Sequence, residues 1–151
     1  MTVQIDFSDP WVYLAERQGE RCPVSELIKP GAQLHGQLVI SIGGRPLPGL
    51  GYFGPSDVCI GMWAHELSEA IRLLDAPDKT RYVFDEGEQG QPAYEFIRDG
   101  CSLWVSVIDS RLSDGLADPS WQRVHCQYAH FRAAVQGFLG RLMELSARFS
   151  K

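Results

Sequence analysis

The dipeptide Asp99-Gly100 lies between two runs of alternating apolar residues, and this arrangement limits the fold more than any other feature of the chain. Asp-Gly favours a two-residue β-hairpin loop, because glycine adopts a positive φ without steric cost. With these two residues as the loop, Phe96 lies opposite Leu103. Residues 80–109 are therefore predicted to form a three-stranded antiparallel meander.

This hairpin register gives the meander one apolar face and one mixed face. The apolar face is predicted to face the core and consists of Tyr94, Phe96, Leu103, Val105 and Val107. The mixed face includes Glu95 and Trp104, which we expect to face each other across adjacent strands. A large aromatic side chain is thus expected on the outer side of the sheet.

Two segments have the apolar period of an amphipathic helix. Residues 56–74 are predicted to be helical, with Ser56 as the N-cap. Their apolar face is formed by Cys59, Ile60, Trp63, Ala64, Leu67, Ala70, Ile71 and Leu74. Residues 128–149 are predicted to form the second helix, with a buried stripe of Phe131, Ala134, Val135, Phe138, Leu142, Leu145 and Phe149.

The other segments complete an α+β pattern. Alternation around Ile5 and over residues 33–42 indicates two strands, and residues 121–126 indicate a last strand. Ser8-Asp9-Pro10 suggests a helix start, and the structure of the following residues to position 30 stays undecided. We expect one domain, residues 1–151, with two main helices (56–74 and 128–149) packed on a largely antiparallel sheet.

Composition excludes several classes of function. The 151 residues carry a net charge of −5, which argues against a nucleic-acid-binding surface, because phosphate contacts need clustered Lys and Arg. No apolar run is long enough to span a membrane. The first residues have neither the basic nor the apolar region of a secretory signal, so we expect a cytoplasmic protein.

No catalytic or metal-binding motif is complete. The four cysteines lack C-x-x-C spacing and are expected to be buried thiols. His65 begins an H-E-x-x-H-like pattern in which Glu69 replaces the second histidine, and an ordinary ion pair between Glu69 and Arg72 is the preferred interpretation. His125 and Cys126 are neighbours on a predicted strand and so point to opposite faces. We expect no enzyme activity, no metal and no cofactor.

The charge distribution is more informative than these motifs. Residues 75–118 contain ten acidic and four basic residues, a net charge of −6. An acidic surface with an aromatic anchor suits the docking of a basic protein, and a solvated surface that keeps the protein soluble is the alternative. The candidate partner-binding residues are Asp85, Glu86, Glu88, Glu95, Trp104, Asp109 and Asp114.

The end of the chain carries a family resemblance. A strand at Val124-His125-Cys126-Gln127 runs directly into a helix with the pattern Y-x-x-F-x-x-A-V-x-x-F-L, which covers residues 128–139. In this pattern, in length and in acidity, the chain resembles small cytoplasmic immunity proteins of bacterial toxin–immunity systems. The resemblance implies a non-catalytic inhibitor that binds a cognate protein toxin and occludes its active surface.

Two other classes of function stay open. An acidic secretion chaperone would hold an extended segment of an effector. A small enzyme could assemble its site from distant residues, with His65, Glu69, His125 and His130 as the first suspects. The sequence also leaves self-association open.

Overall fold

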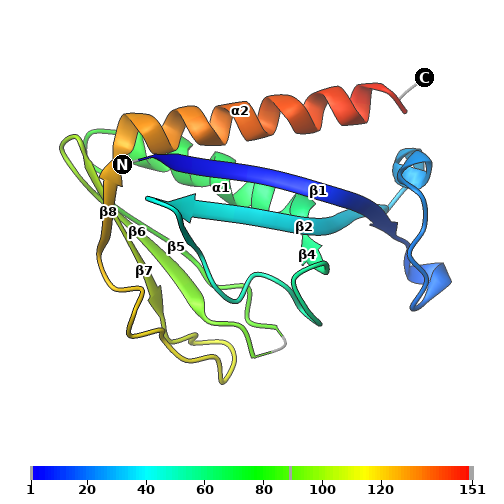
Figure 1. The fold of residues 1–151 in the computed structure, drawn as a ribbon, viewed down its shortest axis with the longest axis horizontal. Coiled ribbons are helices and arrows are strands. Elements are labelled where there is room, and N and C mark those ends of the chain that lie inside the picture. The colour runs from blue at the N-terminus through cyan, green and yellow to red at the C-terminus, as the bar shows by residue number, and fades with distance from the viewer. Residues whose placement is uncertain (1, 89, 150–151) are drawn as a thin grey trace.

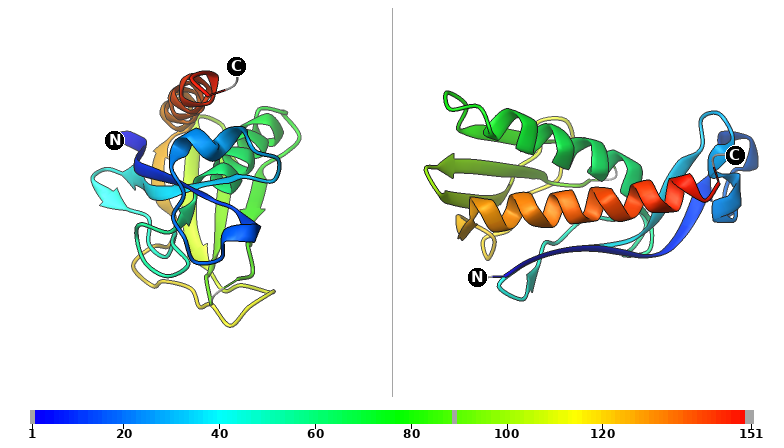
Figure 2. Two further views of the ribbon diagram at one scale, coloured as in Figure 1. Left: turned by 90° about the vertical axis from the view of Figure 1, so that its right-hand side faces the viewer. Right: turned by 90° about the horizontal axis from the view of Figure 1, so that it is seen from above.

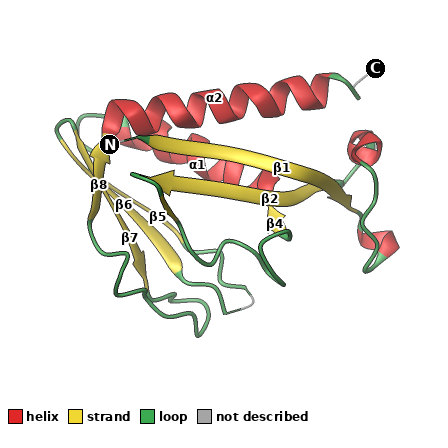
Figure 3. Cartoon of the chain, viewed as in Figure 1, coloured by secondary structure: helices red, strands yellow, loops and turns green. Residues whose placement is uncertain are grey.

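The computed structural model describes residues 2–88 and 90–149, and over these residues it contains two antiparallel sheets and two α-helices (Figures 1 and 3). The first sheet consists of β1 (Val3–Tyr13), β2 (Gln33–Ile42), β3 (Arg45–Pro46) and β4 (Val58–Cys59). The second consists of β5 (Arg81–Phe84), β6 (Ala93–Asp99), β7 (Ser102–Ile108) and β8 (Val124–Gln127). The helices are α1 (Ile60–Leu74) and α2 (Tyr128–Ala147), and the α+β prediction is confirmed.

Both helices pack on both sheets, and the core lies between these layers. Helix α1 contacts β2 and β5, whereas α2 contacts β1, β7 and β8. Seen from above, the two helices run side by side over the strands (Figure 2). The Trp63 ring of α1 lies 4.7 Å from Phe84 and 5.0 Å from Tyr94, and Phe131 of α2 lies 5.6 Å from Phe96. Edge-to-face and tilted aromatic pairs of this kind stabilise a core beyond the area that they bury.

The meander of β5, β6 and β7 forms as predicted, but its hairpin register is shifted by two residues. Asp99 pairs with Ser102, so the loop residues are Gly100 and Cys101. Gly100 has φ 61° at the first loop position, as a type II′ turn requires. Phe96 therefore lies opposite Val105, and Trp104 lies opposite Ile97 rather than beside Glu95. Because side chains alternate with period two, the predicted core face is still correct, and all five of its residues are buried.

The predicted helix start at Ser8-Asp9-Pro10 is wrong. β1 continues to Tyr13 and stays paired with β2, through a bulge between Ser8 and Trp11 in which Asp9 has φ 49°. Pairing with β2 satisfies more backbone groups than a short helix would. The following residues form two short 3₁₀ helices, Ala15–Arg17 and Val24–Ile28.

Helix α1 begins four residues later than the sequence pattern suggests. Val58 and Cys59 form β4 and pair with Gly36 and His35 of β2, so Ser56 is not the N-cap. The predicted apolar face is buried along the helix, with Ala64 at its half-buried margin. The second helix ends at Ala147, two residues before its predicted end.

The last turns of α2 extend beyond the second sheet, along β1 (Figure 1). Phe131, Val135 and Phe138 are fully buried, whereas Leu142 and Leu145 are only partly buried. Within the described residues, neither helix has the length and apolar character that crossing a bilayer requires. Three of the predicted buried thiols are buried, and Cys101 is exposed because it lies in the hairpin loop.

Candidate functional site

A pocket of about 520 Å³ lies between the end of β1, the beginning of β2 and the loop that precedes β4. Aromatic side chains form much of its wall: Trp11, Tyr13, Tyr52 and Phe53. Acidic side chains also line it: Glu20, Asp57 and Glu88. The deepest polar residue is His35, which is only 5% exposed.

The β-bulge in β1 creates the aromatic wall. Before the bulge, Ile5 and Phe7 face the core, and after it Val12 and Leu14 do. The extra residue thus exchanges the two faces of the strand and turns Trp11 and Tyr13 away from the core.

Gly36 makes this close strand approach feasible. A Cβ at Gly36 would lie 3.0 Å from the Ser8 carbonyl oxygen and 3.1 Å from Cα of Pro10. Its φ of 153° is also unfavourable for a residue with a side chain. The strand pairing beside the bulge then places Trp11 directly across from His35.

His35 forms a hydrogen-bonded dyad with Asp57. The His35 Nδ1 atom lies 2.8 Å from Oδ1 of Asp57. Because a carboxylate only accepts hydrogen bonds, Nδ1 carries the proton, and in the neutral imidazole Nε2 is an acceptor. Within the described chain, the buried Nε2 has no hydrogen-bond partner. The ring is enclosed by Trp11, Tyr13 and Tyr52 at centroid distances of 4.8, 5.8 and 6.0 Å.

Tyr52 connects the pocket to the acidic segment that follows β5. Its hydroxyl group is hydrogen-bonded to Glu86, and burial, together with this bond, raises the pKa of Tyr52. Burial also raises the pKa of the Glu86 carboxyl group, and the nearby Glu88 contributes to the same shift. The Oε2 atom of Glu86 is a second buried atom with no partner among the described residues. Two buried acceptors without a partner therefore belong to residues that contact Tyr52.

An internal cation already uses one aromatic wall of the pocket. The Arg21 guanidinium carbon lies 4.8 Å from the centroid of the Trp11 ring. Arg21 also donates to Oγ of Ser56 at 3.0 Å, and the Trp11 indole donates to the Ser56 carbonyl at 3.0 Å. The indole is thus held by the same loop segment that holds the guanidinium.

The structure separates the predicted partner-binding residues into two groups. Glu88 lines the pocket, and Glu86 is hydrogen-bonded to the lining residue Tyr52. Their segment is joined through Asp85 and Ser110 to the loop that carries Asp109 and Asp114. Two of these acids have internal roles, since Asp85 accepts from Ser110 Oγ at 2.7 Å and Asp109 from the Ala117 amide at 2.7 Å.

Trp104 and Glu95 lie elsewhere, on the outer face of the second sheet. The Trp104 ring lies 4.6 Å from the His125 ring and 4.8 Å from the Arg123 guanidinium carbon, and it is half-buried. Glu95 forms an ion pair with Arg81 at 2.8 Å. These contacts stabilise the sheet face and leave Trp104 less available than an isolated aromatic anchor.

The suspected catalytic residues do not come together. His65 is exposed on α1, and Glu69 pairs with Arg72 at 2.6 Å, as predicted. His125 contacts Ser102 Oγ at 2.9 Å, and His130 lies in the first turn of α2. Over the described residues, no group of three or more His, Cys, Asp or Glu side chains could hold a metal ion.

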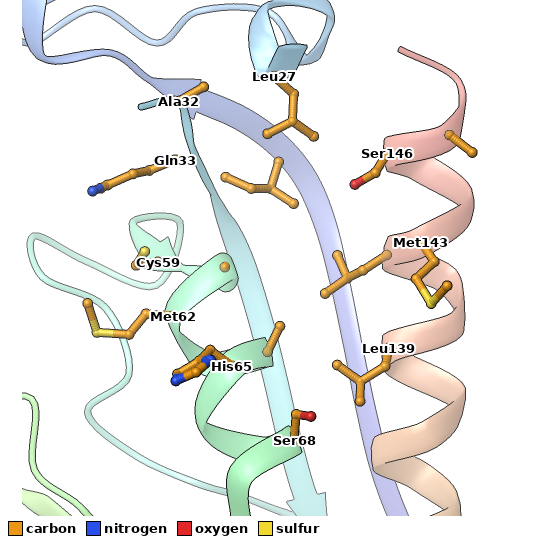
Figure 4. Close-up of a pocket in the computed structure, with 15 residues that line it drawn as sticks. Leu27, Ala32, Gln33, Cys59, Met62, His65, Ser68, Leu139, Met143 and Ser146 are labelled. Carbon is orange, nitrogen blue, oxygen red and sulfur yellow. The ribbon is translucent and has the colours of Figure 1, made fainter. Parts of the chain in front are cut away.

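A larger groove of about 1050 Å³ lies between α1, α2 and the beginning of β2 (Figure 4). It is mainly apolar, with Leu27 and Leu139 among its lining residues, and its described lining contains no acidic side chain and no Lys or Arg. The His35 pocket has more polar and charged groups, and we therefore take it as the candidate site.

Sequence reasoning missed Trp11, His35, Tyr52 and Asp57. Their proximity depends on the bulge in β1 and on the pairing of β4 with β2. No local sequence pattern predicts either feature. The one available signal was Leu34-His35-Gly36, a histidine beside a glycine within an apolar strand. Comparison of the chain with protein-family models, with curated proteins and with solved structures finds no match.

Proposed function

We propose that this protein is a non-catalytic immunity protein that binds a cognate bacterial toxin and covers its active surface. The observation that carries the proposal is one surface on which acidic and exposed apolar side chains occur together. We call it the loop face and define it as residues 47–57, 85–88, 90–92 and 109–120.

Hydrogen bonds hold the three loops of this face together. Gln91 donates to the Gly49 and Leu50 carbonyl groups at 3.2 and 3.0 Å, and Ser113 Oγ donates to the Gln91 carbonyl at 2.9 Å. A docking surface built from tied loops loses little conformational freedom when a partner binds.

The loop face carries three strongly exposed apolar side chains. Phe53, Leu112 and Leu116 are 81%, 69% and 76% exposed. Glu88, Asp109 and Asp114 are exposed on the same loops. Apolar anchors supply affinity in protein interfaces, whereas complementary charge mainly raises the association rate. Toxins that act on nucleic acids need basic clefts, so an acidic face suits a partner of that kind.

A second candidate function follows from the His35–Asp57 dyad. A histidine oriented by a carboxylate is the arrangement of a general base. An enzyme of this kind would lose turnover in a His35→Gln variant, whereas an immunity protein would still neutralise its toxin through the rest of its interface.

Co-expression tests the proposal directly. If an open reading frame next to the gene encodes a toxin, cells that express that toxin should survive only with the wild-type protein present. A loop-face variant (Glu88→Lys, Asp114→Lys, Leu116→Ser) should lose protection, and an outer-sheet variant (Glu95→Lys, Trp104→Ala) tests the other group of candidates. Glu144→Lys makes the same type of charge change on exposed α2 and serves as the control. Failure of the wild-type protein to bind or protect would overturn the proposal.

A further inference from the structure

We propose that the His35 pocket binds a guanidinium or ammonium group, and that in the toxin complex this group belongs to an arginine or lysine side chain of the toxin. The assignment of the group to a toxin rests on the function proposed above. The chemistry of the pocket carries the rest of the inference, in three steps.

The aromatic walls suit a cation. Trp11, Tyr13, Tyr52 and Phe53 present ring surfaces to the pocket, and the electron-rich faces of such rings attract Lys, Arg and ammonium groups. The contact between Arg21 and the Trp11 ring shows that this wall accommodates a guanidinium. The strongly exposed Phe53 ring lies on the loop face and marks the entrance on the side where a partner would dock.

The charges around the pocket favour the same sign of ligand. Glu20, Asp57 and Glu88 line the pocket, and Arg21 is the only Lys or Arg among its described lining residues. Asp57 is engaged with His35, and Glu20 forms an exposed ion pair with Arg17 at 3.5 Å. The exposed Glu88 is therefore the main carboxylate that would attract an incoming cation. A phosphate or carboxylate would meet repulsion from the same residues.

The buried polar atoms need a hydrogen-bond donor. Among the described residues, His35 Nε2 and Glu86 Oε2 have no partner. His35 lines the pocket itself, and Glu86 lies behind it, hydrogen-bonded to the lining residue Tyr52. A buried acceptor without a donor is costly, and the N–H groups of a guanidinium or ammonium would relieve that cost. Nearly every other buried polar side-chain atom in a folded protein has a partner, so this pair of acceptors points to a ligand.

Titration with a small probe tests the chemistry of the pocket without the toxin. We would follow the Trp11 indole resonance by NMR while adding N-acetyl-arginine amide, with N-acetyl-citrulline amide as the uncharged probe of the same shape. Saturable shifts of the Trp11 signal are expected for the arginine probe alone. Glu88→Gln and Phe53→Ala should each weaken its binding about threefold to tenfold. Glu144→Gln, the matched control on α2, should leave it unchanged.

Arg21 supplies a variant of opposite sign. Arg21→Ala removes the internal cation from the Trp11 ring, and the arginine probe should then bind more tightly, by about threefold or more. Equal binding of the arginine and citrulline probes, or no binding of either to wild type and Arg21→Ala, would overturn the inference.

The toxin complex separates this inference from the proposed function. The Kd of the complex should rise about tenfold or more in Phe53→Ala and Glu88→Gln and stay constant in Glu144→Gln. A toxin that binds wild type and both pocket variants equally well would refute the anchoring role while leaving the immunity function intact. A wild-type protein that binds the arginine probe but no toxin would refute the immunity function and leave the cation pocket standing.

Discussion

The imidazole of His35 and the carboxylate of Asp57 are joined by a 2.8 Å contact that ties β2 to the loop before β4. Asp57 reaches His35 because β4 begins one residue later and pairs Cys59 directly with His35. Both side chains are largely withdrawn from solvent, at 6% and 14% exposure. The dyad therefore fixes the loop that forms part of the pocket wall, and it also supplies buried polar atoms of the pocket lining.

Removal of the Asp57 carboxylate should destabilise the protein. Asp57→Ala leaves both ring nitrogens of the buried His35 without a partner, and such a loss costs about 1–3 kcal/mol. The melting temperature should fall by roughly 2–10 °C. Asp57→Asn keeps an acceptor oxygen and should lose less than half as much. Equal loss in the two variants, measured by thermal unfolding, would show that the contact with His35 contributes little.

Gly36 should be one of the least replaceable glycines in the chain. In Gly36→Ala the new methyl group meets backbone atoms of Ser8 and Pro10, which cannot rotate away, at a φ of 153°. We expect a loss of about 2 kcal/mol in urea unfolding and a changed Trp11 environment. Gly140→Ala is the control, because Gly140 lies in α2 with open space around it. That substitution should stabilise the protein by about 0.5–1 kcal/mol.

The hairpin loop of β6 and β7 depends on Gly100. Gly100→Val places a β-branched residue at φ 61° and should cost about 1–3 kcal/mol in urea unfolding, with strain rather than a clash as the cause, because the space around Gly100 is open. Asn tolerates positive φ, so Gly100→Asn should cost clearly less. A Val variant as stable as the Asn variant would contradict the observed loop geometry.

This loop also shows what a sequence pattern can and cannot define. The Asp99-Gly100 pair correctly predicts a hairpin and its core face, but the loop consists of Gly100 and Cys101. Alternation distinguishes the two faces of a strand, and a shift by two residues leaves the faces unchanged. Alternation alone therefore could not distinguish the observed register, in which Trp104 pairs with Ile97, from a register shifted by two residues.

The candidate site was hidden from the sequence for a different reason. Trp11 and Asp57 are brought to His35 by strand pairing over 24 and 22 positions. Local capping and proline signals at Ser8-Asp9-Pro10 and Ser56 favoured helix starts, and the long-range pairing of β1 and β4 with β2 outweighed them. Periodicity predicted the helices, because their burial depends on residues three and four positions apart.

The half-buried carboxyl group of Glu86 should make stability depend on pH in a recognisable way. Burial raises its pKa in the folded state, so between about pH 4, where an unfolded Glu titrates, and the higher folded pKa, the folded state holds more protons than the unfolded state. This contribution is fully favourable below the unfolded pKa and is lost as the pH rises through the folded pKa.

Glu86→Gln cannot ionise and keeps an acceptor for the Tyr52 hydroxyl group. Its melting temperature should exceed that of wild type by about 1–3 °C at pH 7, after allowance for the half-exposed position, and the difference should disappear near pH 4. Glu88 is exposed, so Glu88→Gln should change the melting temperature less, and this change should not follow the same pH dependence. A Glu86→Gln protein that melts below wild type at pH 7 would mean that the ionised carboxylate stabilises the fold. A hydrogen-bond donor to Oε2 within the protein would have this effect.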